Sequence, residues 1–126
     1  MAIQGIFGQQ ELLGAAMQAS VLRNNVIVNN IANADTPGYK KRSVQFESFF
    51  QNAVAEYRAT NNVNLRGSEP VIMFDDPKFK YRIDENNVNI EIEMVNQYEN
   101  AVKYDVISSG SMNNYRRLGL VLSGIR

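Results

Sequence analysis

Residues 29–42 read Asn-Asn-Ile-Ala-Asn-Ala-Asp-Thr-Pro-Gly-Tyr-Lys-Lys-Arg, and this stretch decides the fold of the chain. Pro37 lacks an amide hydrogen and clashes with the preceding turn, so a helix that arrives from the N-terminal side ends just before it. Gly38 tolerates a positive φ angle and allows the chain to reverse. Asn30 and Asn33 carry short amides that can bond the carbonyls left unpaired at a helix end. The stretch therefore predicts a helix end followed by a turn that Tyr39 completes.

An apolar stripe precedes this turn and predicts a helix from Gln10 to Ala34. Its members recur at alternating spacings of three and four, which places them on one helix face. They are Leu12, Ala15, Ala19, Leu22 and Val26. The stripe is narrow and rich in alanine, so another helix can approach it closely. It can be buried in a core of its own chain or against another chain, and both alternatives stay open. Residues 1–10 show no such periodicity and predict a flexible or partner-ordered leader.

A second long helix is predicted at the C-terminal end, within residues 87–126. Asn89 is a candidate N-cap, and Glu91 and Glu93 lie in the first turn, where carboxylates suit the helix dipole. One heptad-like track supplies the expected packing residues of this helix: Met94, Tyr98, Ala101, Met112, Tyr115 and Leu122. The glycine and serines of 108–111 predict a kink or a close helix approach. Because the two helices match roughly in length, they are expected to lie side by side as a coiled-coil-like pair.

The middle segment, residues 39–86, carries weaker signals and is predicted to be partly extended or disordered. A short helix is expected through residues 53–57, followed by a run of turn formers. Residues 71–74 are apolar and bounded by polar turns, which predicts a short strand, and residues 79–83 alternate like a possible hairpin partner. Phe46, Phe49 and Phe50 fit either a core or a contact patch for a neighbouring subunit. The fold class is therefore mainly α, with terminal helices at 1–38 and 87–126 and an irregular or short β-hairpin middle.

Composition narrows the possible functions. The 126 residues include 13 cationic and 13 anionic side chains, and this balance argues against a nucleic-acid binder, which normally has a basic excess. The chain has no cysteine and no histidine, so it lacks the commonest nucleophiles, general bases and soft metal ligands. We therefore expect no enzyme activity, no catalytic or metal site and no cofactor. No run reaches the roughly 20 apolar residues of a membrane span, and no cleavable secretory signal is visible.

A family resemblance rests on the stretch Asn-Ile-Ala-Asn-Ala-Asp-Thr-Pro-Gly-Tyr at residues 30–39. It is similar to the signature near the N-terminus of the bacterial flagellar axial proteins, the rod, hook and hook-associated families. Residues 87–94 and 99–104, together with Tyr81-Arg82, resemble the proximal rod protein family that carries the letter B. A sibling proximal rod family shares the N-terminal motif, and residues 99–104 favour the B-type family over it. These matches cover about two thirds of the chain.

The resemblance implies a structural subunit of the flagellar basal body rod, the shaft that transmits motor torque. It implies helical assembly with copies of the same chain, with other flagellar rod proteins, and with the inner-membrane ring and its rod adaptor protein. It also implies passage through the flagellar type III export apparatus without signal cleavage, and a location in the periplasm. The alternative from another class is a monomeric helical adaptor or chaperone-like module, which would stay monomeric at any concentration.

Overall fold

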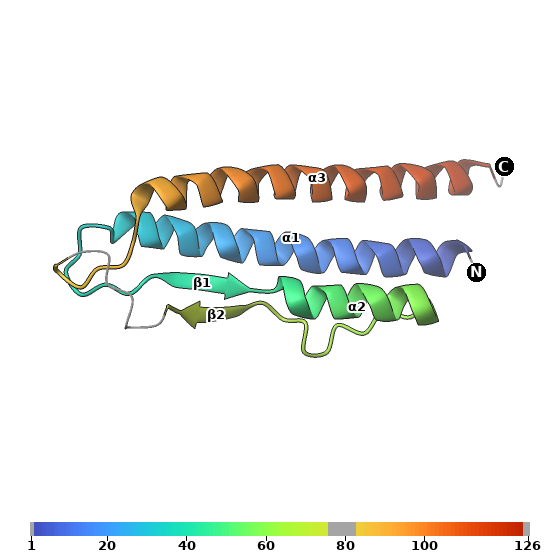
Figure 1. Cartoon of the computed structure of the whole chain (residues 1–126). Coiled ribbons are helices and arrows are strands. Elements are labelled where there is room, and N and C mark those ends of the chain that lie inside the picture. Colours follow the sequence, from blue (N-terminus) through green and yellow to red (C-terminus); the bar gives the residue numbers. More distant parts are fainter. Residues whose placement is uncertain (1, 76–82, 125–126) are drawn as a thin grey trace.

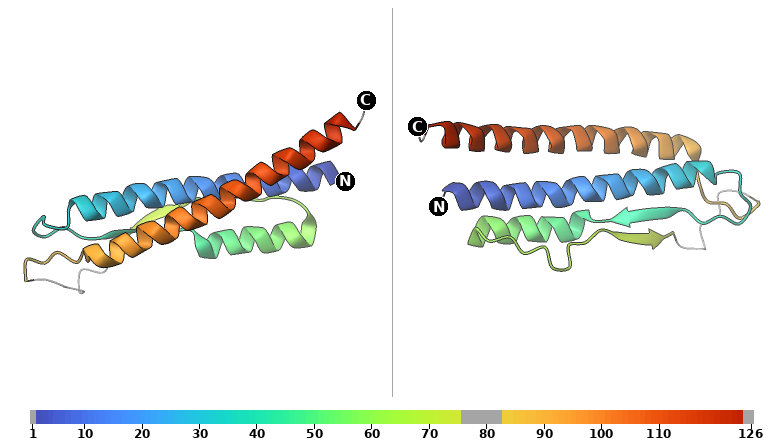
Figure 2. Two further views of the ribbon diagram at one scale, coloured as in Figure 1. Left: turned by 90° about the horizontal axis from the view of Figure 1, so that it is seen from above. Right: turned by 180° about the vertical axis from the view of Figure 1, so that it is seen from behind.

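The computed structural model describes residues 2–75 and 83–124, which form three helices and two short strands in the order α1, β1, α2, β2, α3 (Figure 1). Helix α1 spans Ala2–Ala32 and helix α3 spans Ile90–Ser123. They run antiparallel along the length of the molecule, and α3 crosses over α1 in the view from above (Figure 2). The predicted mainly α fold with paired terminal helices is confirmed.

Helix α1 is longer at its start than the sequence pattern indicates. Residues 1–10 were predicted to be a flexible or partner-ordered leader, and the flexible alternative is wrong, because the helix already begins at Ala2. Tertiary contact explains the difference. The Tyr57 hydroxyl donates a hydrogen bond to the Gly5 carbonyl at 2.6 Å, and a Cβ on Gly8 would lie 2.6 Å from the Tyr57 ring. The absence of a side chain at Gly8 thus lets helix α2, Glu47–Thr60, which carries Tyr57, dock closely on this end of α1.

Helix α3 begins where the sequence predicts. Asn89 is its N-cap, and its side chain accepts hydrogen bonds from the amides of Glu91 and Ile92. The helix continues without interruption through residues 108–111. The close approach expected there is present, since a Cβ on Gly110 would lie 3.8 Å from the Leu13 side chain of α1.

The middle segment forms a second layer on the other side of α1 (Figure 1). Strand β1, Arg42–Gln45, leads directly into α2, Glu47–Thr60, and β2, Val71–Phe74, returns antiparallel to β1. The predicted helix and the predicted strand at 71–74 are confirmed. Residues 79–82 of the expected hairpin partner lie outside the described residues, and the described partner of β2 is β1, with Val44 opposite Ile72.

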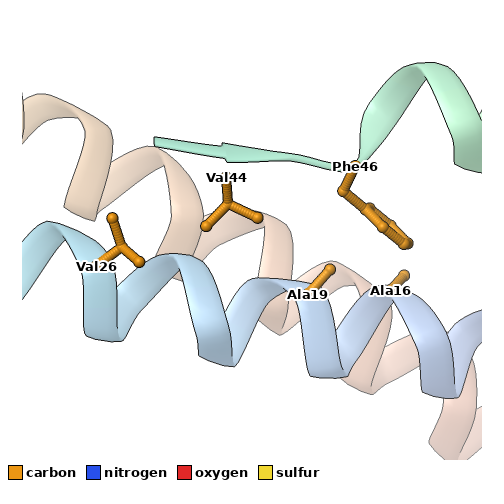
Figure 3. Packing of buried hydrophobic residues seen from close by; sticks show 5 residues of the cluster. All are labelled: Ala16, Ala19, Val26, Val44 and Phe46. Carbon is orange, nitrogen blue, oxygen red and sulfur yellow. The ribbon is translucent and has the colours of Figure 1, made fainter. Parts of the chain in front are cut away.

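The apolar core lies between α1 and this second layer (Figure 3). Val44 of β1 sits over Val26, and Phe46 lies over the small side chains of Ala16 and Ala19. Phe46 is 5% exposed and stacks on the Phe50 ring at 4.9 Å between centroids. Alanine on α1 leaves the room that the Phe46 ring occupies, so the narrow stripe is used within the chain. Among the three phenylalanines considered for a contact patch, Phe46 is therefore a core residue.

Candidate assembly surface

The turn after α1 is organised by Asn30, which is fully buried. Its amide nitrogen donates to the Arg42 carbonyl at 2.8 Å and to the Glu93 carboxylate at 2.9 Å. Its amide oxygen accepts from the Arg42 amide at 3.0 Å and from the Tyr39 hydroxyl at 3.2 Å. All the hydrogen-bonding capacity of this side chain is used, so Asn30 ties the helix end, strand β1 and helix α3 to one another.

Glu93 is the counterpart of Asn30 on α3, and only 1% of its side chain is exposed. Its carboxylate accepts the bond from Asn30 and forms an ion pair with Lys41, whose ammonium lies 2.9 Å away. Burial of a charge is costly unless it is paired and hydrogen-bonded, and here both conditions hold. The ion pair therefore fixes the start of α3 against the turn at residues 29–42.

A second amide, Asn86, closes the end of α1 from the opposite side. Its nitrogen donates to the carbonyls of Asn33, Ala34 and Thr36 at 2.8–3.0 Å, which satisfies carbonyls that the helix end leaves unpaired. The Gly38 amide donates to the Asp84 carbonyl at 2.9 Å, and Gly38 has a φ of 71°. The chain reversal thus depends on a glycine at this position.

Polar side chains also line the seam where α3 faces α1. Glu93, Asn100, Ser111 and Asn114 are all buried on this face. The Asn100 amide donates to the Ser20 carbonyl at 2.9 Å, while its oxygen has no hydrogen-bond partner among the described residues. Hydrogen bonds such as those from Asn100 to the Ser20 carbonyl and from Gln10 to Ser111 therefore join α3 to α1 along this seam.

Apolar side chains of α3 point away from the seam. The predicted track residues Met94, Tyr98, Met112, Tyr115 and Leu122 are 54–73% exposed. Ala101 on the same track is also exposed. Large apolar side chains gathered on one exposed helix face are typical of an interaction site. Among the described residues the track is therefore not the face that α3 buries against α1, and its role in packing against other chains stays a prediction.

The predicted packing residues of α1, unlike those of α3, are buried or partly buried within the chain. Leu12, Ala19 and Val26 are buried, and Ala15 and Leu22 are partly buried beside the core. Of the predicted turn residues, Asn30 and Tyr39 are brought together. Pro37 and Gly38 are exposed, and Asn33 donates to the Asn29 carbonyl within its own helix end.

Four residues of this arrangement were missed by the sequence reasoning as site residues: Lys41, Asn86, Glu93 and Asn100. Glu93 and Asn100 are seven residues apart, and Asn114 follows after fourteen more. These multiples of seven place the polar residues on one helix face, as in the heptad repeat of a packed helix pair. An apolar criterion overlooks such a seam.

A peripheral ion pair joins α1 to the start of α2. The guanidinium of Arg23 lies 2.6 Å from the Glu47 carboxylate. Partial burial alone would raise the pKa of Glu47, but the hydrogen bond from Arg23, a backbone hydrogen bond and the charge of Arg23 together hold that pKa below its ordinary value. Lys103 of α3 adds a smaller effect of the same sign.

The part of the chain that the structure describes lacks two kinds of site. No group of three or more acidic, histidine or cysteine side chains is placed to hold a metal ion. None of the described helices combines the length and apolar character needed to cross a membrane.

Comparison with known proteins gives a consistent picture. A family model described as flagella basal body rod protein matches residues 13–40, which include Asn30 and most of the turn at residues 29–42. The chain is 32% identical over 123 residues to the flagellar basal body rod protein FlgB of Cereibacter sphaeroides, covering 90% of this chain and 94% of the relative. It is 30% identical to FlgB of Borrelia hermsii, covering 80% and 85%, and 26% identical to FlgB of Bacillus subtilis strain 168, covering 93% and 95%.

These matches span both terminal helices as well as the variable middle, and they agree with the resemblance carried by the Asn30 turn. The chain belongs to the FlgB family of flagellar basal body rod proteins.

Proposed function

We propose that this chain, a structural component of the flagellar basal body rod, builds the proximal rod by packing its exposed α3 face against neighbouring subunits. The observation that carries the proposal is the division of α3 into two faces. Its buried face is polar and occupied by α1, whereas its outward face carries Met94, Tyr98, Met112 and Tyr115 at exposures above one half. A chain that acted alone would gain no stability from this outward apolar surface.

The proposed partners are copies of this chain, other flagellar rod proteins, the inner-membrane ring and its rod adaptor protein. The proposed location is the part of the rod within the periplasm, reached through the flagellar export apparatus without cleavage of a signal. Closely packed helices suit a shaft that transmits torque, because well-packed protein interiors are dense and compress little.

The test replaces an exposed track residue in cells that lack the native gene. Met112→Glu puts a charge on the outward face without disturbing the core, because Met112 is 54% exposed. We expect normal cellular levels of the chain, loss of the chain from purified basal bodies, and loss of swimming. Asn113→Glu is the matched control. Asn113 is the next residue, and its side chain is exposed but lies off the track, so this change should leave swimming intact.

The result that would overturn the proposal is normal swimming and normal incorporation of the Met112→Glu chain. A chain that never accompanies purified basal bodies, even with the native sequence, would favour the monomeric adaptor instead.

A further inference from the structure

Strand β2 forms an exposed edge of the two-stranded sheet. It lies on the side of β1 that faces away from α1, at the boundary of the molecule (Figure 1). Its four side chains, Val71 to Phe74, are all apolar and 41–65% exposed. Proteins usually protect an edge strand by keeping it short or by adding a charge, a proline or a bulge. Apart from its shortness, β2 has none of these, since residues 71–74 contain no charge or proline and pair with β1 in one unbroken register.

The pairing with β1 fixes which backbone groups of β2 face outward. In an antiparallel pair, opposite residues alternate between those that exchange hydrogen bonds and those that do not. The Asp75 amide donates to the Lys41 carbonyl, so Met73 is the next residue of β2 whose backbone faces β1. The amides and carbonyls of Ile72 and Phe74 therefore point away from β1.

The opposite edge of the sheet supports this alternation. The Arg42 backbone exchanges two hydrogen bonds with the Asn30 side chain, and the Val44 carbonyl accepts one from Arg23 at 3.4 Å. Side chains of α1 thus cover the outward groups of β1. The outward amides and carbonyls of β2 have no such cover, because no described residue forms a hydrogen bond with them.

A cation without a carboxylate partner lies beside this edge. The Arg42 guanidinium lies over the Phe74 ring, 5.3 Å from its centroid, and its side chain is exposed. It forms no ion pair with any described carboxylate, Asp75 included, whereas the neighbouring Lys41 is already paired with Glu93. An acidic side chain beside Phe74 on an added strand would therefore meet a complementary charge.

A second copy of this chain does not fit the edge in an open assembly. Among the described residues only β2 offers an uncovered strand edge, because α1 covers the edge of β1. Two copies joined through β2 would use the same edge on both sides, so the contact would be complete after two chains. The contacts of the proposed rod repeat without closing, which favours a strand from a different protein.

We propose that β2 accepts an extended segment of a different protein of the rod as the third strand of the sheet. The outward groups of Ile72 and Phe74 would bond to the backbone of that segment, as in other cases of strand addition to a sheet edge. The segment would carry apolar side chains on both faces, to match β2, and an acidic side chain beside Phe74. This inference rests on the proposed function and adds the chemistry of one partner.

The test removes an outward amide while leaving the bonds between β1 and β2 in place. Ile72→Pro lacks the amide hydrogen that faces outward, and Ile72→Thr keeps it while losing the same apolar side chain. We expect Ile72→Pro to lower the amount of chain in purified basal bodies about two- to tenfold relative to Ile72→Thr, since one backbone hydrogen bond is lost. Phe74→Pro and Phe74→Thr form a second matched pair with the same expected difference. Urea midpoints that agree within each pair show that the effect lies in assembly.

Hydrogen exchange measured by mass spectrometry gives a second result that needs no substitution. In the purified native chain, the amides of Ile72 and Phe74 should exchange faster than the amide of Met73, which bonds to β1. In basal bodies, fragments that cover residues 71–74 should gain protection at the two outward amides. Unchanged exchange in basal bodies, or equal incorporation of the proline and threonine variants, would overturn the proposal and leave the proposed function standing.

The charge of the partner is tested at Arg42. Arg42→Gln should lower the amount of chain in basal bodies about two- to fivefold, whereas Arg42→Lys keeps the charge and should retain it. Equal incorporation of the two variants would contradict the acidic side chain on the added strand.

Met73→Cys distinguishes a second copy from a different protein, because the chain has no cysteine of its own. Pairing of two β2 edges through all their outward groups would set Met73 of one copy opposite Met73 of the other, close enough for a disulfide. Disulfide-linked dimers of the Met73→Cys chain in oxidised basal bodies would therefore overturn the proposal in favour of a second copy. Absence of the native chain from basal bodies would refute the proposed function, and this inference with it.

Discussion

Replacing Asn30 with alanine removes the side chain that joins three elements at the turn. The Asn30→Ala chain loses four hydrogen bonds, of which the one to Glu93 is fully buried and reaches a charged group. A hydrogen bond to a charged group contributes about 1.5–3 kcal/mol and a neutral one about 1 kcal/mol. Water can replace part of the bonding at the exposed Arg42 and the half-buried Tyr39, so we expect a loss of about 3 kcal/mol.

A loss of this size is a large share of the roughly 5–15 kcal/mol by which a domain is usually stable. It can be measured by urea unfolding of the purified full chain, with circular dichroism as the signal for helix. With an m value of about 2 kcal/mol/M, the midpoint should fall by about 1.5 M. Asn33→Ala is the control in the same turn, because its side chain makes only two exposed local bonds, donating to the Asn29 carbonyl and accepting from the Thr36 hydroxyl. It should cost less than about 1 kcal/mol.

Equal midpoints for the two variants would refute the reasoning. That result would mean that the buried amide contributes no more than a local helix-end bond, and that the turn at residues 29–42 does not hold α3 in place.

Three further outcomes are expected in the same assay. Gly8→Ala should destabilise the chain because its Cβ would lie 2.6 Å from the Tyr57 ring. In a Tyr57→Ala background most of this cost should disappear, since only the contact with Val63 at 3.1 Å then opposes the gain of up to about 1 kcal/mol from helix propensity. Gly38→Ala should cost about 1 kcal/mol from backbone strain alone, since φ is 71° and no atom within 4 Å opposes a Cβ. The Arg23–Glu47 pair should stabilise the folded chain fully above about pH 4.5, the pKa of Glu47 in the unfolded chain. This stabilisation should be lost as the pH falls through the lower pKa of Glu47 in the folded chain. Glu47→Gln should therefore reduce the dependence of the urea midpoint on pH in that acidic range.

The sequence predicted the elements with strong local signals. The proline and glycine at 37 and 38 marked the end of α1, and Asn89 marked the start of α3, because caps and breakers act through their own backbone chemistry. The start of α1 was missed, because the contact of Gly8 with Tyr57 is tertiary and leaves no periodic trace. The pairing of β1 with β2 was missed for the same reason, since four-residue strands far apart in the chain carry no mutual signal.

The polar seam shows a different limit. Apolar periodicity assigned the Met94 track to helix packing, but the face of α3 that meets α1 carries Glu93 and Asn100 instead. Hydrophobic patterns find the faces that avoid water. They do not show whether α1 or another chain covers such a face, and they do not detect a seam lined by polar residues such as Glu93 and Asn100, which bond to the Asn30 side chain and the Ser20 carbonyl of α1.

The amide-rich seam also has a thermal consequence. Exposing apolar surface raises the heat capacity of unfolding, whereas exposing polar surface lowers it. The polar seam lined by Asn100, Ser111 and Asn114 therefore adds little to the heat capacity of unfolding. The free energy that holds α1 and α3 together along this seam thus changes little with temperature. In the proposed assembly, contacts through the outward valines and methionines would weaken on cooling, as apolar contacts do. The contacts between subunits would thus be more sensitive to cold than the pairing of α1 with α3 within each subunit.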